Sequence, residues 1–315
     1  MSQSETSIDQ HALAEVLEGL RQPQKTISPK YFYDARGSDL FEQITRLDAY
    51  YPTRTEMGIL RNSGPEIGKV IGPDAIIVEF GSGNSEKIHL LLDVLDRPRA
   101  YVPIDISAEH MEAAAAGIDA DYPSLTVIPV AGDYTKPMHL PGHSALDGAR
   151  LTGFFPGSTI GNFPPEEAEA FLVTARDILD GGDLLIGADL QKDPAVLNLA
   201  YNDPEGVTAA FNLNMLPHLN QLIGTDFDAG AFEHHAFYNE VLGRIEMHLV
   251  SQAAQIVHIG GSAVSFAADE TIHTESSHKY TLEGFAALAA RAGWRTAQTW
   301  CDAKPWFSLH LLTPA

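Results

Sequence analysis

An alternation of apolar strands and helices, beginning near residue 74, constrains the fold of this chain more than any other feature. Short apolar strands separated by helices form a parallel sheet that the helices cover. We expect five such strands, at 75–80, 100–105, 125–131, 151–155 and 183–189. The alternation stops after the fifth strand and returns at Thr281, with a helix that ends at Gly293 and strands at 294–300 and 307–312. The pattern therefore predicts an α/β fold that is interrupted by an insertion.

A final helix followed by two strands, with an antiparallel last strand, is how the Rossmann-like seven-stranded sheet of a class I methyltransferase ends. We expect residues 56–190 and 281–315 to form that domain. The insertion, 191–280, contains alternating stretches at 244–251 and 255–266, which are typical of an antiparallel meander. Together with residues 10–55 it is expected to form a second α+β domain that binds the substrate.

A glycine-rich loop, Glu79 to Ser85, follows the first strand directly. Gly81 and Gly83 allow the backbone to turn sharply and to approach a ligand closely. A dinucleotide-binding loop would continue with glycine at position 86, where this chain has a glutamate that would also repel a pyrophosphate. The loop therefore suits an uncharged nucleoside with an amino-acid tail better than NAD, although Gly-Ser-Gly turns are also common without a ligand.

Two further acids follow the next strands of the expected sheet. Asp105 ends the second strand, where an acid typically accepts hydrogen bonds from ribose hydroxyls, and Asp133 follows the third. Tyr134 comes next and could stack on an adenine ring. Acids at three successive carboxyl ends of a parallel sheet indicate a ligand site, and with the glycine loop they predict S-adenosylmethionine as the ligand.

Composition narrows the class of acceptor. The chain has 42 acidic and 20 basic residues, a net charge of −22, and no cluster of Lys or Arg, which disfavours nucleic acid and favours a small molecule. Its N-terminus has no apolar secretory segment, and no apolar run is long enough to span a membrane. A single cysteine, Cys301, fits a reducing compartment. We expect a soluble, cytoplasmic protein that binds neither membrane nor nucleic acid and acts as a monomer.

Three segments are candidates for acceptor binding. The loop after the fourth strand, 154–163, has a proline, two glycines and Asn162, which offers both a donor and an acceptor, although it could equally be a plain loop with a helix-capping asparagine. The segments 30–41 and 50–56 are rich in tyrosine and phenylalanine beside Asp, Arg and Ser, an unusual mixture for a core. Aromatic faces and hydroxyls of this kind suit a cationic amine.

With these segments side by side, the sequence resembles the histidine Nα-methyltransferases of ergothioneine biosynthesis, which trimethylate the α-amino group of L-histidine to hercynine. The resemblance extends from about residue 22 onward. The most specific markers are FYDARGSDLF at 32–41, YYPTRTE at 50–56, EFGSGNSEK at 79–87 and FFPGSTIGNF at 154–163.

The resemblance implies a role for each matching residue. The S-adenosylmethionine contacts would be Gly81, Lys87, Asp105, Asp133 and Tyr134, although the family more often has phenylalanine at the last position. The amino-acid substrate would be bound by Tyr50, Asn162 and Tyr201, the latter two around its carboxylate. Tyr33 and Phe41 would surround the reacting amine as the catalytic residues, and Met247, Glu275 and Ser277 would contact the imidazole.

Glu275 would determine specificity in this interpretation. A carboxylate can accept a hydrogen bond from an imidazole N–H while Ser277 addresses the other nitrogen, whereas an indole offers one N–H and no acceptor. Leaving a buried carboxylate without its partner is costly, so such a site should reject indoles. From its spacing alone, Glu275 could instead be an ordinary surface acid.

Other functions remain open at this point. One is Nα-methylation of another aromatic amino acid, such as tryptophan or a prenylated tryptophan, and another is a catalytically silent regulatory protein with the same fold. A metal site is not expected, because His234 and His235 are adjacent on a predicted loop and no set of His, Asp and Glu shows ligand spacing.

Overall fold

The alternating strands form one sheet in the computed structural model, which describes residues 9–82, 86–106, 108–148 and 150–315. The strand order is β13-β14-β7-β6-β2-β3-β4, and β5 also pairs with β3. The strands are β2 Ile76–Phe80, β3 Ala100–Asp105, β4 Thr126–Val127, β5 Val130–Ala131, β6 Leu151–Phe155, β7 Asp183–Asp189, β13 Trp294–Cys301 and β14 Phe307–Pro314. β14 is antiparallel to both β7 and β13, and the remaining pairs are parallel, which confirms the predicted α/β class.

The third predicted strand, 125–131, differs from the prediction. It is divided into β4 and β5, so that the sheet counts eight strands in the described part of the chain instead of seven. Pro129 lies between the two pieces and has no N–H to donate to the ladder. Both pieces pair with β3, so the direction of the chain is kept across the interruption.

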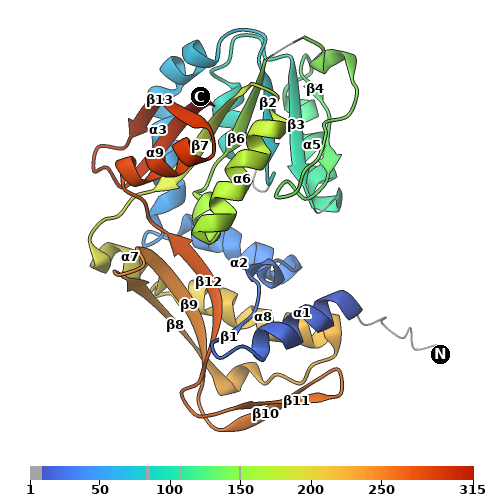
Figure 1. Ribbon diagram of the computed structural model, residues 1–315, viewed down its shortest axis with the longest axis vertical. Helices are drawn as coiled ribbons and strands as arrows, with labels where there is room; N and C mark the ends of the chain where they lie inside the picture. The colour runs from blue at the N-terminus through green and yellow to red at the C-terminus, as the bar shows by residue number, and fades with distance from the viewer. Residues whose placement is uncertain (1–8, 83–85, 107, 149) are drawn as a thin grey trace, which may run out of the picture. The chain divides into compact units, whose positions relative to one another are not determined.

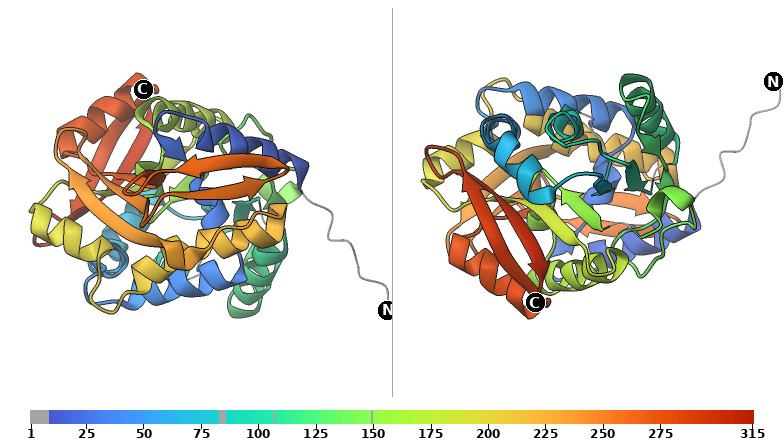
Figure 2. Two further views of the ribbon diagram at one scale, coloured as in Figure 1. Left: turned by 90° about the horizontal axis from the view of Figure 1, so that it is seen from below. Right: turned by 90° about the horizontal axis from the view of Figure 1, so that it is seen from above.

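Helices cover both faces of this sheet because its strands are apolar on both sides. On one face α6 (Pro165–Ile178) and α9 (Leu282–Arg291) pack on alternate residues of β2, such as Val78 and Phe80. On the other face α3 (Tyr51–Ile71), α4 (Glu86–Leu92) and α5 (Ala108–Asp121) pack on Ile77 and its neighbours. Figure 1 shows α6 across the near face, and the right-hand view of Figure 2 shows helices on both sides of the sheet.

The predicted start signals of two helices are confirmed. Thr281 caps α9 by accepting a hydrogen bond from the Gly284 N–H, and Pro165 opens α6 with two acids in its first turn. The predicted cap at Ser107 lies outside the described residues.

A second, four-stranded sheet has the order β1-β12-β9-β8. Its strands are β1 Lys25–Thr26, β8 Phe232–Asn239, β9 Arg244–Ser251 and β12 Thr271–His278, and a separate hairpin joins β10 Gln255–Ile259 to β11 Ser262–Phe266 (Figure 1). β8 is antiparallel to β9, and β1 joins β12 in parallel, so the sheet is mixed. The predicted meander of 244–251 with 255–266 is wrong in its pairing, because β9 belongs to the four-stranded sheet and 255–266 forms the separate β10–β11 hairpin. The accompanying helices are α1 Gln10–Leu20, α2 Ala35–Arg46, α7 Pro194–Tyr201 and α8 Val207–Ile223, with short 3-10 turns η1 Pro29–Phe32 and η4 Ala229–Ala231.

The chain divides into two compact units. The eight-stranded unit contains Pro52–Gln191 and His278–Ala315, and the four-stranded unit contains the chain up to Tyr51 and Lys192–Ser277. The predicted boundaries at 55/56, 190/191 and 280/281 lie within a few residues of these divisions. That the four-stranded unit binds the substrate stays a prediction.

Candidate active site

The glycine loop begins where β2 ends. Gly81 has a φ of 76°, a left-handed conformation that favours glycine, and its N–H donates to the Ile104 carbonyl at 2.9 Å. A Cβ at this position would lie 3.3 Å from the Tyr134 hydroxyl. The adjoining Ser82 hydroxyl is buried and has no hydrogen-bond partner among the described residues. A close-packed glycine beside an unsatisfied buried hydroxyl fits a loop that receives a polar ligand; residues 83–85 lie outside the described residues.

Glu79 places a carboxyl group inside the apolar part of the unit. Its side chain points away from that of its neighbours Val78 and Phe80, and it accepts a hydrogen bond from the Tyr101 hydroxyl. Burial raises the pKa of Glu79 to about 7, although this hydrogen bond and the charge of Lys87 act in the opposite direction. Asp105 and Glu56 also act electrostatically on it. Glu56, Glu79 and Asp105 therefore form a cluster of acids near Lys87, which is a predicted cofactor contact.

Glu56 connects three of the marker segments. It is fully buried, and its carboxylate forms an ion pair with Lys87 Nζ at 2.6 Å. Both of its oxygens also accept from the Gly157 N–H, at 3.0 and 2.8 Å. Glu56 belongs to the segment YYPTRTE, Lys87 to EFGSGNSEK and Gly157 to FFPGSTIGNF. Glu56 is a site residue that the sequence motifs did not reveal. Its buried carboxylate holds the side chain of Lys87, a predicted cofactor contact.

Asp105 and Asp133 lie at the same edge of the sheet. Asp105 pairs in register with Ala131 of β5, two residues before Asp133. Burial alone would raise the pKa of Asp133, but hydrogen bonds from Thr135 and Lys136 outweigh it and lower that pKa. The strand-end arrangement of acids that the sequence predicted is therefore present in this unit.

Tyr134 lies between the glycine loop and an aromatic cluster. Its ring centroid is 5.9 Å from those of Phe155 and Phe171 and 6.1 Å from that of Phe80. Burial raises the pKa of its hydroxyl to about 12, so the group stays protonated at neutral pH. The ring is thus packed between Gly81 and the aromatic cluster, and its stacking on an adenine stays a prediction.

Asn162 ends the short 3-10 turn η3 (Thr159–Asn162) after β6. Ser158 precedes it with a φ of 56°, and the Ser158 hydroxyl accepts from the Asp189 N–H at 2.8 Å. A Cβ at Gly161 would lie 2.7 Å from the His278 carbonyl oxygen. These contacts fix the backbone of the loop that carries Asn162. A substrate-binding role for Asn162 stays a prediction.

The aromatic segment 30–41 forms a cluster in the four-stranded unit. The rings of Tyr33, Phe41 and Phe211 lie with centroids 5.9 Å apart in each pair. Tyr33 is exposed, with 46% of its surface accessible. The two predicted catalytic residues are therefore adjacent, and one face of the pair is open.

Two residues of the segment 32–41, Asp34 and Gly37, explain the turn that leads into α2. Asp34 caps α2 by accepting from the Gly37 N–H at 2.6 Å, and the same oxygen accepts from the Asn214 side chain at 2.8 Å. A Cβ at Gly37 would overlap the Phe32 carbonyl oxygen. The spacing of Asp and Gly in FYDARGSDLF is therefore needed to hold Tyr33 and Phe41 together.

Three predicted substrate residues lie together in the same unit. The Tyr50 and Tyr201 rings are 6.1 Å apart at a near-perpendicular angle, and the buried Tyr201 hydroxyl donates to Ser277 Oγ at 3.0 Å. Met247 is buried on β9, and its carbonyl accepts from Thr274 Oγ1 at 3.0 Å. Glu275, next to Thr274 on β12, is half-buried, and its contact with the imidazole stays a prediction.

The predicted loop position of the paired histidines is wrong. His234 and His235 lie in strand β8, so their side chains point to opposite faces of the sheet. His234 contacts the Asn212 side chain and the Tyr201 carbonyl, both at 2.9 Å, and burial lowers its pKa. His234 and His235 therefore cannot bind one metal ion together, but three other residues that the sequence spacing did not indicate, Glu246, His248 and His273, lie close enough to do so.

Comparison with known proteins identifies the family. Residues 12–314 match the family described as "Histidine-specific methyltransferase, SAM-dependent". The chain belongs to this family. It is 45% identical to the histidine N-alpha-methyltransferase of Mycolicibacterium smegmatis and 41% identical to that of Mycobacterium tuberculosis, in both cases over 94% of this chain and 93% of the relative. It is also 33% identical to ergothioneine biosynthesis protein 1 of Neurospora crassa, over 89% of this chain and 32% of that longer protein.

As a member of the histidine-specific methyltransferase family, the chain divides its predicted site residues between its units. The five predicted cofactor residues and Asn162 belong to the eight-stranded unit, and Tyr33, Phe41, Tyr50, Tyr201, Met247, Glu275 and Ser277 belong to the four-stranded unit. Within the described residues, no helix is long and apolar enough to cross a membrane.

Proposed function

We propose that this protein transfers methyl groups from S-adenosylmethionine to the α-amino group of L-histidine, giving trimethylated hercynine, as a step of ergothioneine biosynthesis. The observation that carries the proposal is the 45% identity, over almost the whole chain, to a histidine N-alpha-methyltransferase. The convergence of three marker segments at Glu56 supports it, because it provides a specific framework for the donor loop.

The donor site is assigned to the eight-stranded unit. S-adenosylmethionine, when bound, would supply a sulfonium methyl group whose carbon an amine lone pair attacks, with S-adenosylhomocysteine as the leaving group. Gly81 would leave room for close approach of the ligand, Asp105 would accept hydrogen bonds from the ribose hydroxyls, and Tyr134 would stack on the adenine ring; the packing of Tyr134 beside Gly81 and the position of Asp105 at the end of β3 support these roles. These residues hold and orient the ligand, which is the main contribution that such a displacement needs from a protein.

The acceptor site is assigned mainly to the four-stranded unit. Tyr50, Asn162 and Tyr201 would bind the amino-acid backbone, and Glu275 with Ser277 would hydrogen-bond the two imidazole nitrogens. Because an ammonium has no lone pair, the first transfer requires loss of a proton, for which Tyr33 with solvent is the proposed route. Phe41 and the tyrosine rings would then hold the methylated, cationic intermediates by cation–π contact.

Mass spectrometry of the products of L-histidine with S-adenosylmethionine tests the function. We expect species heavier by one, two and three methyl groups, and titration calorimetry with the demethylated donor should show binding of histidine but not of tryptophan. Absence of methylated histidine together with methylation of tryptophan would replace this proposal by the aromatic alternative. Donor binding without any turnover would favour the silent protein.

Two substitutions test the assigned roles at the amine. Tyr33→Phe and Phe41→Ala should lower kcat and shift the products towards the mono- and dimethylated forms. Tyr122→Phe is the matched control for Tyr33→Phe, because it also removes a single phenolic hydroxyl, here one that donates to Asp93 at 2.7 Å. An unchanged product distribution in both variants would contradict the roles of Tyr33 and Phe41 without contradicting the reaction.

A further inference from the structure

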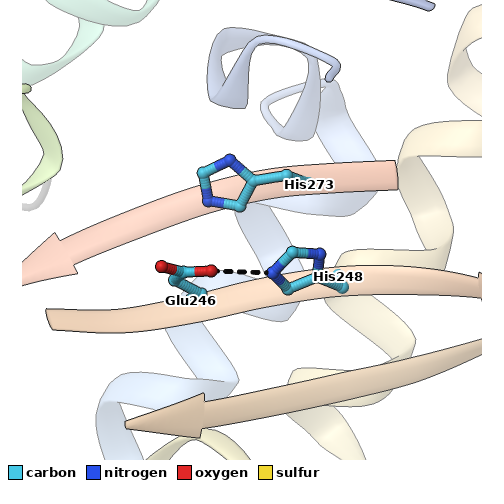
Figure 3. Close-up of side chains that lie close together, drawn as sticks. All are labelled: Glu246, His248 and His273. Carbon is cyan, nitrogen blue, oxygen red and sulfur yellow. Dashed lines mark hydrogen bonds and ion pairs between the residues drawn. The ribbon is translucent and has the colours of Figure 1, made fainter. Parts of the chain in front are cut away.

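One face of the four-stranded sheet gathers two histidines and a glutamate. Glu246 and His248 are two residues apart on β9, so their side chains point to the same face, and His273 joins them from the adjacent strand β12 (Figure 3). One potential ligand atom from each residue lies within 4.8 Å of those of the other two. None of the three has a role in the proposed reaction.

The distances suit a tetrahedral metal ion. His248 Nε2 and Glu246 Oε2 are 3.1 Å apart. Two ligands bound to zinc at about 2.1 Å in a tetrahedral arrangement lie about 3.4 Å from one another. The pair therefore has nearly the separation of two ligands of one ion. The third group, His273, has its Nε2 atom 3.0 Å from the Glu275 carbonyl oxygen and 3.1 Å from Ser276 Oγ, and an ion bound at Nε2 would replace these contacts.

Neighbouring groups hold the carboxylate in this orientation. Glu246 Oε1 accepts from Arg244 Nε at 2.9 Å and from Asn239 Nδ2 at 3.1 Å, while Oε2 faces His248. Groups that orient a ligand by binding its other atoms are a regular feature of metal sites. Arg244 carries a positive charge that opposes a second cation, and the carboxylate oxygen it binds is the one directed away from the proposed ion.

His248 has a polar atom that the protein leaves unsatisfied. The residue is 6% exposed, and its ring stacks on Phe237 at 5.5 Å and packs against His273 at 4.9 Å. With Nε2 on Glu246, the Nδ1 atom is buried and has no hydrogen-bond partner among the described residues. Packing against Phe237 and His273 therefore holds the ring with Nε2, the atom that would bind the ion, directed at Glu246, and Nδ1 takes no part in the proposed site.

Two imidazoles and one carboxylate make up the possible donor set of this cluster. Nitrogen ligands favour zinc over calcium or magnesium, which prefer oxygen. We propose that Glu246, His248 and His273 bind a zinc ion on this face of the sheet.

The ion would join the two strands that carry residues of the proposed acceptor site. Met247 lies between the two β9 ligands with its side chain directed to the opposite face, and Glu275 follows His273 by two residues. Zinc bound by His273 and the two β9 residues would fix the spacing of these strands. This consequence rests on the proposed function, whereas the metal site itself does not.

Titration of the chelator-treated full-length protein with zinc alone, against a chromophoric zinc indicator, tests the site. We expect one equivalent to bind, with affinity lowered at least tenfold in each of Glu246→Gln, His248→Asn and His273→Asn. His258→Asn is the matched control, because His258 Nδ1 contacts Asp226 Oδ2 at 2.8 Å in an exposed pair on β10. It should leave zinc affinity unchanged.

Cobalt(II) gives a second readout that needs no variant. Tetrahedral coordination by nitrogen and oxygen should produce intense visible absorption, which zinc then displaces. Failure of the wild type to bind one equivalent, a weak octahedral cobalt spectrum, or equal affinity of the wild type and a folded His273→Asn variant would each overturn the proposal. None of these measurements uses histidine or S-adenosylmethionine, so they are independent of the methyl-transfer assay.

Discussion

Glu79 is an acid in a strand whose neighbours are all apolar, and its energetics depend on pH. Its side chain is buried, and its pKa is raised from the ordinary 4.5 to about 7. The unfolded chain releases this proton near pH 4.5, but the folded protein retains it until near pH 7. The group therefore contributes stability that is complete below the ordinary pKa and is lost as the pH rises through 7.

Glu79→Gln should flatten this dependence. A pKa difference of this size corresponds to about 3 kcal/mol of unfolding free energy lost between pH 4.5 and 7, which an uncharged amide cannot lose. Urea denaturation of the wild type and the variant at several pH values measures it. Glu112→Gln, at an exposed position of α5, serves as control and should follow the wild type. A parallel pH profile for Glu79→Gln would contradict the raised pKa.

Site residues could be predicted where a short sequence motif contains the residue that would contact the ligand. Gly81, Asp105 and Asp133 could be placed because a glycine loop and strand-end acids are local patterns. Glu56 could not, since a glutamate near the start of a helix is usually exposed, and only its contact with the Gly157 N–H reveals its burial. Likewise, Glu246 and His273 are distant in sequence and meet only because β9 and β12 are neighbours.

At the scale of elements, the start of α2 depends on a glycine. Gly37→Ala would place a Cβ against the Phe32 carbonyl oxygen, and the backbone that connects Tyr33 to α2 would have to move. We expect a loss of about 2 kcal/mol or more, comparable to overpacking a core. Urea denaturation followed by tyrosine fluorescence and circular dichroism measures the change.

Gly58→Ala is the matched control for this substitution. Gly58 also lies in a helix, α3, but a Cβ there meets no atom within 4 Å. Because alanine favours helix over glycine, this variant should gain about 0.5–1 kcal/mol. Equal effects of the two substitutions would show that helix propensity, and not the contact with Phe32, decides the result at Gly37.

Helices and strands were predictable where the pattern of apolar residues and the capping residues indicate the same element. The strands of the parallel sheet are apolar on both faces, and Thr281 is a residue type that commonly caps a helix, as it does for α9. The split of the third strand differs from the prediction because Pro129 lies within an otherwise apolar run and has no N–H to donate to the neighbouring strand. The parallel pairing of β1 with β12 joins segments almost 250 residues apart, as in the pair Lys25–Ile272, and no local pattern encodes it.

At the scale of the whole molecule, the chain passes between its units at 51/52, 191/192 and 277/278. The division was predictable because the strand–helix alternation stops and returns near the last two of these points. The connections there are tied together within the eight-stranded unit: the Tyr280 N–H donates to the Asp189 carbonyl, and the Gln191 N–H to the Tyr280 carbonyl, at 2.9 and 2.8 Å. Lys279 adds a buried ion pair with Asp189 at 2.8 Å, with both side chains 1% exposed.

Lys279→Met should therefore destabilise the protein strongly. It leaves the Asp189 carboxylate buried without its lysine, and breaking such a pair costs about 3–5 kcal/mol. The double variant Asp189→Asn with Lys279→Met removes both charges and should recover part of this loss, as a double-mutant cycle by urea denaturation would measure. Arg150→Met breaks a pair with Asp183 in which the arginine is exposed, and it should cost less than 1 kcal/mol. A single variant as mild as Arg150→Met would mean that the Lys279–Asp189 pair contributes no more than a surface ion pair.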